Sequence, residues 1–150
     1  MYDYRHILFP VDFSAQVEKI GSQVVKLARE SGARVTLLHV IAGFPEDIPN
    51  DWIAPEDQPP REYLENRCQR ELQRLQAKLG LEGAAQACIL TEHSARSAIL
   101  EFARSHDVDL IVMGAHGRSH GRLGALIGST TNGVVSGATQ DVLVVRPDAA

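Results

Sequence analysis

Apolar residues along the chain gather into five short runs that are separated by longer, more polar segments. Each run is rich in valine, isoleucine or leucine and is nearly continuous, which is typical of strands buried on both faces of a parallel sheet. A strand with one solvated face would instead alternate apolar and polar positions. The five predicted strands cover residues 7–11, 35–41, 87–90, 110–113 and 142–145.

The segments between these runs carry apolar residues at intervals of three and four, the spacing of one helix face. The first helix is expected between Ser14, an N-cap residue, and Gly32, which stands where a helix-ending glycine is common. The second helix ends before Gly80, the third begins near Ser94, and a weaker fourth begins near Ser129. Strand and helix therefore alternate along the whole chain.

This alternation predicts one α/β domain over residues 1–150, with a five-stranded parallel sheet, helices on both faces and right-handed crossovers. If the first three strands wind outward in one direction and the last two in the other, the strand order is 3-2-1-4-5. Strands one and four are then neighbours at the centre. The one long connection, 42–59, contains the only tryptophan, Trp52, and is expected to be a lid, a binding loop or a disordered excursion.

Composition and charge exclude several classes of protein. A chain of 150 residues that is 44% hydrophobic is long enough to bury a core, and its net charge of −4 argues against a nucleic-acid binder. No apolar run approaches the ~20 residues of a membrane span, and the N-terminus does not read as a signal peptide, so a cytoplasmic location is expected. Cys68 and Cys88 are too few and too far apart for a disulfide scaffold or a zinc cluster, which predicts reduced, packed thiols.

The charge and the glycines are unevenly distributed. Seven of the twelve glycines lie between Gly114 and Gly137, and residues 110–140 contain no Asp or Glu but include Arg118 and Arg122. The rest of the chain carries 13 basic and 19 acidic residues, so the −4 chain divides into a −6 scaffold and a +2 stretch. A glycine-rich, acid-free segment in an acidic protein favours an anion-binding site.

This segment lies where an open α/β sheet binds its ligands, beyond the carboxyl ends of the strands at the point where the winding reverses. Asp12 directly follows the first strand, and Gly114 opens a loop after the fourth strand that ends in the hydroxyl cluster Ser129-Thr130-Thr131. The start of the fourth helix offers unpaired N–H groups and partial positive charge, so a di- or triphosphate is the expected ligand. Neither a GxxxxGK[ST] nor a GxGxxG motif is present.

These residues resemble the universal stress protein family, and specifically its ATP-binding branch. The resemblance covers nearly the whole chain, from the opening Tyr-Arg-His-Ile-Leu-Phe-Pro-Val-Asp-Phe-Ser to the terminal Val-Leu-Val-Val-Arg. The family's loop motif is Gly, two residues, Gly, nine residues, then Gly-Ser or Gly-Thr. Gly114, Gly117 and Gly128-Ser129 match this motif, but the spacer 118–127 has ten residues, and the extra residue is expected to bulge the loop.

The resemblance implies a Rossmann-like fold of the adenine nucleotide alpha-hydrolase type, bound ATP or another adenine nucleotide, and Mg²⁺ or Mn²⁺ held largely by phosphate and water oxygens. It also implies a homodimer through the last strand, formed by Val142, Leu143, Val144 and Val145. Carried over by position, the nucleotide-binding residues are Pro10, Val11, Asp12 and Val40 at the adenosine, Met113, Gly114, His116 and Gly117 at ribose and phosphates, and Gly128, Ser129, Thr130 and Thr131 at the phosphate chain.

Several of these residues have a plainer interpretation. Asp12 could cap the first helix. His116 and His120 have the spacing of two metal ligands on a helix, but the glycines beside them argue against a helix there, so no metal site is predicted. His39 lies in a predicted buried strand and is expected to be a hydrogen-bonded core histidine. The helix at 61–79 carries many charges, which predicts a solvated amphipathic face.

Other charged residues near the predicted strand ends have two interpretations as well. Glu92 and His93 follow the third strand and are expected in a surface turn. Arg118 and Arg122 either are solvated or contact phosphate directly.

Three functions remain open from the sequence. The chain is a nucleotide-binding regulatory protein with absent or slow hydrolysis, an ATP-hydrolysing enzyme, or a dimerisation module without nucleotide. The loop contains no lysine and no carboxylate to orient water, although Asp12 or His116 could assist hydrolysis. The retained glycines argue against loss of the nucleotide, so the regulatory protein is the favoured prediction.

Overall fold

Five parallel strands form the centre of the molecule in the computed structural model, which describes residues 3–115 and 128–146. They are β1 (His6–Pro10), β2 (Arg34–Ala42), β3 (Ala85–Thr91), β4 (Leu110–Gly114) and β5 (Asp141–Val145). The strand order is β3-β2-β1-β4-β5, and every pair is parallel. The predicted order is confirmed, and β1 and β4 are neighbours at the centre of the sheet.

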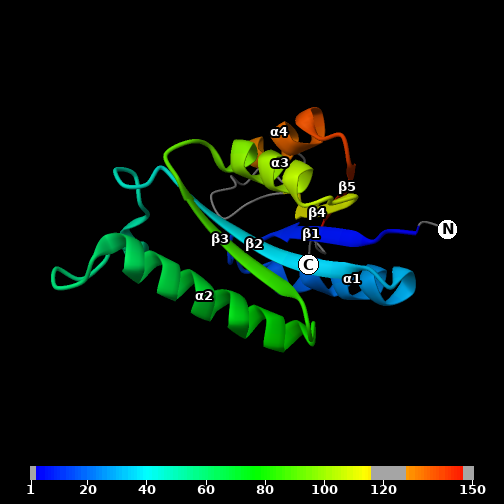
Figure 1. The fold of residues 1–150 in the computed structure, drawn as a ribbon, viewed down its shortest axis with the longest axis horizontal. Coiled ribbons are helices and arrows are strands. Elements are labelled where there is room, and N and C mark those ends of the chain that lie inside the picture. Colours follow the sequence, from blue (N-terminus) through cyan, green and yellow to red (C-terminus); the bar gives the residue numbers. More distant parts are fainter. Residues whose placement is uncertain (1–2, 116–127, 147–150) are drawn as a thin grey trace.

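Four helices cover the two faces of this sheet (Figure 1). They are α1 (Val17–Ser31), α2 (Pro60–Leu79), α3 (Ala95–Ser105) and α4 (Ser129–Gly137), and a short 3-10 helix, η1 (Asn50–Trp52), lies in the connection before α2. In Figure 1, α1 and α2 lie on one side of the strands and α3 and α4 on the other. Across the described ranges, no helix combines the length and the apolar character needed to cross a bilayer.

The central strands β1, β2 and β4 have buried side chains on both faces, which explains why their runs do not alternate with polar residues, whereas the edge strands β3 and β5 are only partly buried. In β1, Ile7 and Phe9 pack in the core on the α1 and α2 side, whereas Leu8 packs with Ile99 of α3 and Val134 of α4 on the other side. Successive side chains of a strand point to opposite faces, so each helical layer receives alternate residues of the same run. The sheet is thereby held at its centre by two separate cores.

Helix ends follow the predicted residues at four of five positions, and α4 begins at Ser129 as expected. Gly32 and Gly80 end α1 and α2 in the left-handed conformation, with φ of 72° and 68°, and the Ser94 hydroxyl accepts the Ser97 N–H at the start of α3. Ser14 is not the N-cap of α1. The helix begins at Val17 instead, because residues 14–17 first form a turn in which the Val17 N–H donates to the Ser14 carbonyl.

The prediction of two reduced cysteines is wrong. A disulfide joins Cys68 of α2 to Cys88 of β3, with Cα atoms 6.4 Å apart. The helix turns back at Gly80 and packs along β3, so two residues that lie 20 positions apart in sequence become neighbours on one face of the sheet. Sequence spacing alone carries no information about this approach, because it depends on how the helix packs against the strand.

Candidate functional site

The carboxyl ends of β1 and β4 lie side by side at the switch point of the sheet, and each is followed by a change of direction. After β1, Val11 donates its N–H to the Leu38 carbonyl, and Phe13 then takes a φ of 59°. Positive φ is rare for a bulky side chain and marks a constrained turn. Asp12 is half-buried at this turn, directly beyond the central strand.

The carboxylate of Asp12 stabilises its own turn and does not cap a helix. Its Oδ1 accepts the N–H of Ser14 at 3.0 Å, two residues on, whereas α1 begins only at Val17. A side chain that accepts the N–H two residues later forms an Asx turn. The alternative that Asp12 is the cap of the first helix is therefore wrong, and the carboxylate is held at the edge of the sheet between β1 and α1.

The start of α4 is attached to the end of β4 by two hydrogen bonds. The Thr131 hydroxyl donates to the Gly114 carbonyl at 2.8 Å, and the Gly128 N–H donates to the Ala115 carbonyl at 2.7 Å. The first N–H groups of a helix have no partner within the helix and favour anions. In α4 these belong to Ser129, Thr130 and Thr131, so the structure brings helix N–H donors to the same edge as Asp12.

The backbone of Val40 also faces this edge. The Leu38 carbonyl points toward β1, where it accepts the Val11 N–H, and backbone groups two residues apart on a strand face the same side. The register of β1 and β2 ends at Pro10 and Leu38. Val40 therefore presents its N–H and carbonyl toward β1 beyond the last residue pair, where a planar base could receive hydrogen bonds.

The remaining predicted residues divide into three groups. Pro10 ends β1, and the side chains of Val11 and Met113 are buried in the cores, which leaves their backbones to border the site. The Thr131 hydroxyl is already bonded to Gly114, so its free donor is the backbone N–H. The predicted positions His116 and Gly117, together with Arg118, His120, Gly121 and Arg122, lie outside the described residues.

A cluster of three rings borders the site on the α1 and α2 side, and the sequence analysis did not predict it. The Phe13 ring centroid lies 4.7 Å from that of His39 and 6.1 Å from that of Trp52, and His39 and Trp52 are 5.4 Å apart. Trp52 is only 4% exposed although it belongs to the long connection. The guanidinium carbon of Arg67 lies 4.2 Å above its ring. The connection is therefore packed onto the end of the sheet, and Trp52 is its buried aromatic side chain.

His39 is a hydrogen-bonded core histidine, as predicted. Its Nδ1 lies 2.6 Å from the Val11 carbonyl. Because a carbonyl can only accept, Nδ1 carries the proton in this contact. This hydrogen bond fixes the backbone one residue before Asp12 and joins the ring cluster to the end of β1.

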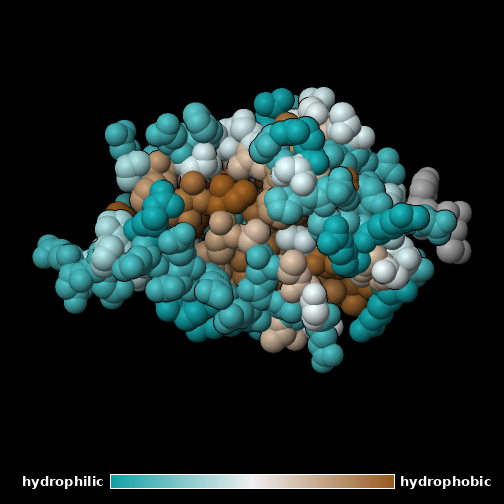
Figure 2. Space-filling view, viewed as in Figure 1, coloured by the Kyte–Doolittle hydropathy of each residue, from teal (hydrophilic) through white to brown (hydrophobic). Residues whose placement is uncertain are grey.

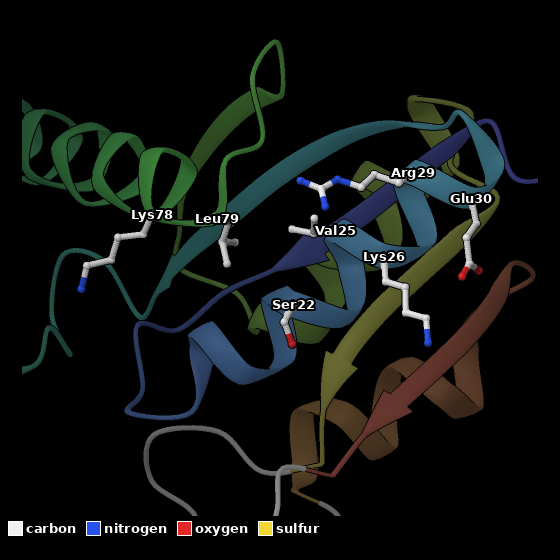
Figure 3. A pocket seen from close by; sticks show the side chains of 7 residues that line it. All are labelled: Ser22, Val25, Lys26, Arg29, Glu30, Lys78 and Leu79. Carbon is white, nitrogen blue, oxygen red and sulfur yellow. The ribbon is translucent and has the colours of Figure 1, made fainter.

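A groove between α1 and α2 is the main alternative location for an anion (Figure 3). It contains Lys26, Arg29 and Lys78, but Figure 3 shows their cationic ends pointing in different directions. Lys78 is paired with Glu18 at 3.2 Å, and Glu30 also lines the groove. The side chains thus do not converge on one point, and the carboxyl edge remains the candidate site.

Comparison with known proteins identifies the family. A model of the universal stress protein family matches residues 3–146, almost the whole chain. The chain belongs to the universal stress protein family. Universal stress protein A homolog 1 of Coxiella burnetii is 27% identical over 142 residues, covering 95% of this chain and 96% of that protein.

Solved structures confirm the fold of this universal stress protein. The structure of MJ0577 from Methanocaldococcus jannaschii is 26% identical, with a TM-score of 0.75, and the alignment covers 99% of this chain and 100% of that one. A universal stress protein solved in complex with cAMP has a TM-score of 0.67 and 19% identity, covering 97% of this chain and 98% of that one. The predicted α/β architecture is therefore shared over its full length.

The aromatic cluster carries no sequence signal that periodicity analysis detects. In this universal stress protein, Phe13, His39 and Trp52 come from a turn, a strand and a long connection, and only the fold brings them together. The one available indication is that the only tryptophan lies in a polar, proline-containing connection, where a large aromatic side chain is otherwise uncommon.

Proposed function

We propose that this universal stress protein binds an adenine nucleotide, with ATP as the first candidate, at the carboxyl edge between β1 and β4. The observation that carries the proposal is the pair of hydrogen bonds that fixes the start of α4 to the end of β4, beside the turn that holds Asp12. This arrangement offers a carboxylate for a nucleoside and helix N–H donors for phosphate. The relative solved with cAMP supports the choice of an adenine nucleotide.

The nucleoside and the phosphates are assigned to opposite sides of this edge. The turn after β1 and the open backbone of β2 take the adenosine, and the end of β4 with the start of α4 takes the phosphates. In this proposal the adenosine contacts Pro10, Val11, Asp12 and Val40, and the ribose and phosphates contact Met113, Gly114, Gly128, Ser129, Thr130 and Thr131, with His116 and Gly117 as predicted further contacts.

The metal expected with ATP fits a site that contains few carboxylates. Mg²⁺ and Mn²⁺ prefer phosphate and water oxygens to a dedicated protein cage, and Asp12, the carboxylate held by its own turn, is assigned to the adenosine. The cation would neutralise the part of the phosphate charge that the helix N–H groups leave uncompensated. The chain's own contribution is then to orient the nucleotide through fixed backbone donors.

We propose a regulatory role in the stress response, in the cytoplasm, in which bound nucleotide changes the state of a homodimer and hydrolysis is absent or slow. The dimer would form through β5, an edge strand whose Leu143 is 38% exposed. An uncovered apolar edge strand tends to pair with another chain. Leu143→Arg should shift a dimer toward monomer in light scattering, and an unchanged mass would contradict this interface.

Binding is tested by calorimetry with ATP, ADP, AMP and cAMP on the wild type and two variants. Gly128→Val adds a side chain at the start of α4 without backbone strain, because Gly128 has the ordinary dihedral angles φ −61° and ψ 156°. Asp12→Ala removes the carboxylate at the other end. Each should weaken ATP binding about tenfold or more, since a hydrogen bond to a charged group contributes about 1.5–3 kcal/mol.

Ser136→Ala is the matched control, because Ser136 lies at the far end of α4 and its hydroxyl donates to the Asn132 carbonyl of the same helix. It should bind ATP as the wild type does. Equal ATP affinity for wild type, Gly128→Val and Asp12→Ala, with circular dichroism showing all three folded, would refute the proposed site. Release of ADP in a single turnover, faster than in buffer, would instead favour the ATP-hydrolysing enzyme.

A further inference from the structure

The disulfide lies beside the aromatic cluster and reaches it from two directions. Cys68 is adjacent in sequence to Arg67, whose guanidinium covers the Trp52 ring and also donates to the Asp51 carbonyl. Cys88 is the register partner of His39 on the neighbouring strand, so their side chains lie on the same face of the sheet. The bond therefore joins Cys68, the residue that follows Arg67 on the helix, to Cys88, the strand residue beside His39.

The same cluster forms one border of the candidate nucleoside site. Phe13 directly follows Asp12, and the His39 ring holds the Val11 carbonyl at 2.6 Å. Trp52 stacks on Phe13 with an angle of 14° between the two rings. A shift of α2 relative to β3 would thus move Arg67 and Trp52 against the turn that presents Asp12.

We propose that Cys68 and Cys88 form a reversible thiol–disulfide switch that sets the position of Trp52 and, through it, the affinity for the nucleotide. The part of this inference that concerns affinity rests on the proposed function, whereas the movement of Trp52 does not. The disulfide fixes α2 against β3 and keeps Arg67 over the ring. Reduction removes this tether, loosens Trp52 and weakens nucleotide binding.

The two cysteines of the disulfide differ in exposure. Cys68 is completely buried, but Cys88 is partly exposed on β3, the strand at the edge of the sheet. In Figure 1, β3 runs along the open side between the helical layers, and Figure 2 shows apolar surface there without a helix across it. We therefore place the attack of a small dithiol on the Cys88 side of the bond.

The exchange is balanced as a two-electron reaction with a dithiol reductant. One thiolate of the reductant attacks Sγ of Cys88, the Cys68–Cys88 bond breaks, and Cys68 leaves as a thiolate that takes up a proton. The second thiol of the reductant then loses its proton and attacks the reductant's sulfur in the mixed disulfide. This releases the Cys88 thiolate, which is protonated. The protein gains two thiols and the reductant becomes a cyclic disulfide; a small disulfide oxidant reverses the reaction.

Apolar packing, besides the disulfide, attaches α2 to the sheet. One face of α2 is buried through Leu64, Leu72 and Leu75 as well as Cys68, and these apolar contacts persist after reduction. Gly21 of α1 also approaches the side chain of Leu79 closely, which holds the end of the helix. Reduction can consequently change the position of α2 without unfolding the domain.

Trp52 is the only tryptophan in the chain, so its fluorescence reports on this cluster without any nucleotide. Acrylamide quenching is compared for the native protein before and after treatment with dithiothreitol, with alkylation and mass spectrometry to count thiols. Quenching should increase on reduction and return on reoxidation. A disulfide that resists the dithiol under native conditions, or equal quenching in both states, would overturn the switch.

Three variants distinguish the proposed switch from a general loosening of the domain on reduction. Cys68→Ala/Cys88→Ala should show the quenching of the reduced protein and no response to dithiothreitol. Arg67→Met keeps the disulfide and the apolar stem but removes the guanidinium above Trp52, so most of the response should be lost. Arg70→Met changes an exposed residue of the same helix and should respond as the wild type does. An Arg67→Met protein that responds fully would contradict the route through Arg67.

Calorimetry with ATP on the oxidised and reduced wild type then tests the coupling. Reduction should weaken binding about fivefold or more, the lower range of known coupling between sites. Equal affinity in both states would overturn the coupling and leave the proposed function intact. If neither state binds ATP or the other adenine nucleotides, the proposed function fails, while the quenching of Trp52 still decides whether the thiol pair is a switch.

Discussion

His6 offers a quantitative test of how a buried polar residue stabilises the amino end of the sheet, away from the candidate site. It is 3% exposed, its Nδ1 lies 2.8 Å from the His106 carbonyl, and its Nε2 lies 2.7 Å from the Thr36 hydroxyl. Because the carbonyl only accepts, Nδ1 carries the proton and Nε2 accepts from Thr36. Thr36 is itself 5% exposed. Each of these two buried side chains therefore supplies the hydrogen-bond partner of the other.

The magnitude follows from what each substitution leaves unpaired. His6→Leu leaves the buried Thr36 hydroxyl without its partner, and Thr36→Val leaves Nε2 without its donor; each should lower the free energy of unfolding by about 1–3 kcal/mol. The double variant removes both partners together. It should therefore cost less than the sum of the single changes, by about 0.5–3 kcal/mol. Urea denaturation followed by circular dichroism measures all four proteins, and additive losses would refute the mutual hydrogen bond.

The same residue gives the stability a pH dependence. Burial is the largest cause that lowers the pKa of His6 below its ordinary value of 6.5. The unfolded chain therefore binds a proton before the folded chain does as the pH falls. The stability from His6 is complete above pH 6.5 and is lost as the pH falls from there toward the folded pKa. His6→Leu should remove this part of the loss of stability at low pH, whereas His93→Gln, a control at an exposed position, should not. Identical pH profiles of stability for wild type and His6→Leu would contradict the role of His6.

Three further variants test the backbone and the disulfide. Asp107 has a φ of 53° at the end of α3, where the Val108 N–H donates to the Ala103 carbonyl, so Asp107→Gly should raise the free energy of unfolding by about 0.5–1 kcal/mol. Gly32 has a φ of 72°, so Gly32→Ala should lower the free energy of unfolding by about 1 kcal/mol. Urea denaturation measures both changes. The disulfide closes a loop with a sequence separation of 20, and loop-closure entropy predicts that Cys68→Ala/Cys88→Ala loses about 3 kcal/mol in the same assay.

The sheet could be predicted because its evidence is local and repeated. Continuous apolar runs such as 7–11 have two buried faces, and helices ending at Gly32 and Gly80 separate them, which leaves few topologies with right-handed crossovers. The position of the candidate site at the carboxyl ends of the strands followed from the predicted strand order. Asp12 and Gly114 could therefore be placed near each other from the sequence, and the structure brings β1 and β4 together as expected.

What could not be predicted depends on packing between distant segments. The contact of Cys68 with Cys88 depends on the direction in which α2 returns along β3, and the burial of Trp52 depends on Phe13 and Arg67, which belong to other elements. The start of α1 at Val17 rather than after Ser14 reflects a turn stabilised by Asp12. None of these contacts changes the hydrophobic period of any single segment.

The two hydrogen bonds between the end of β4 and the start of α4 bear on the length of the connection that joins these two elements. Because the Gly128 N–H meets the Ala115 carbonyl and the Thr131 hydroxyl meets Gly114, the two ends of the connection are set by hydrogen bonds within the described residues and not by the length of chain between them. Lengthening a connection of about a dozen residues by one adds less than about 0.1 kcal/mol of closure entropy. Closure entropy therefore sets almost no limit on the length of this connection, so a spacer of ten residues in place of the family's nine can join the same two ends.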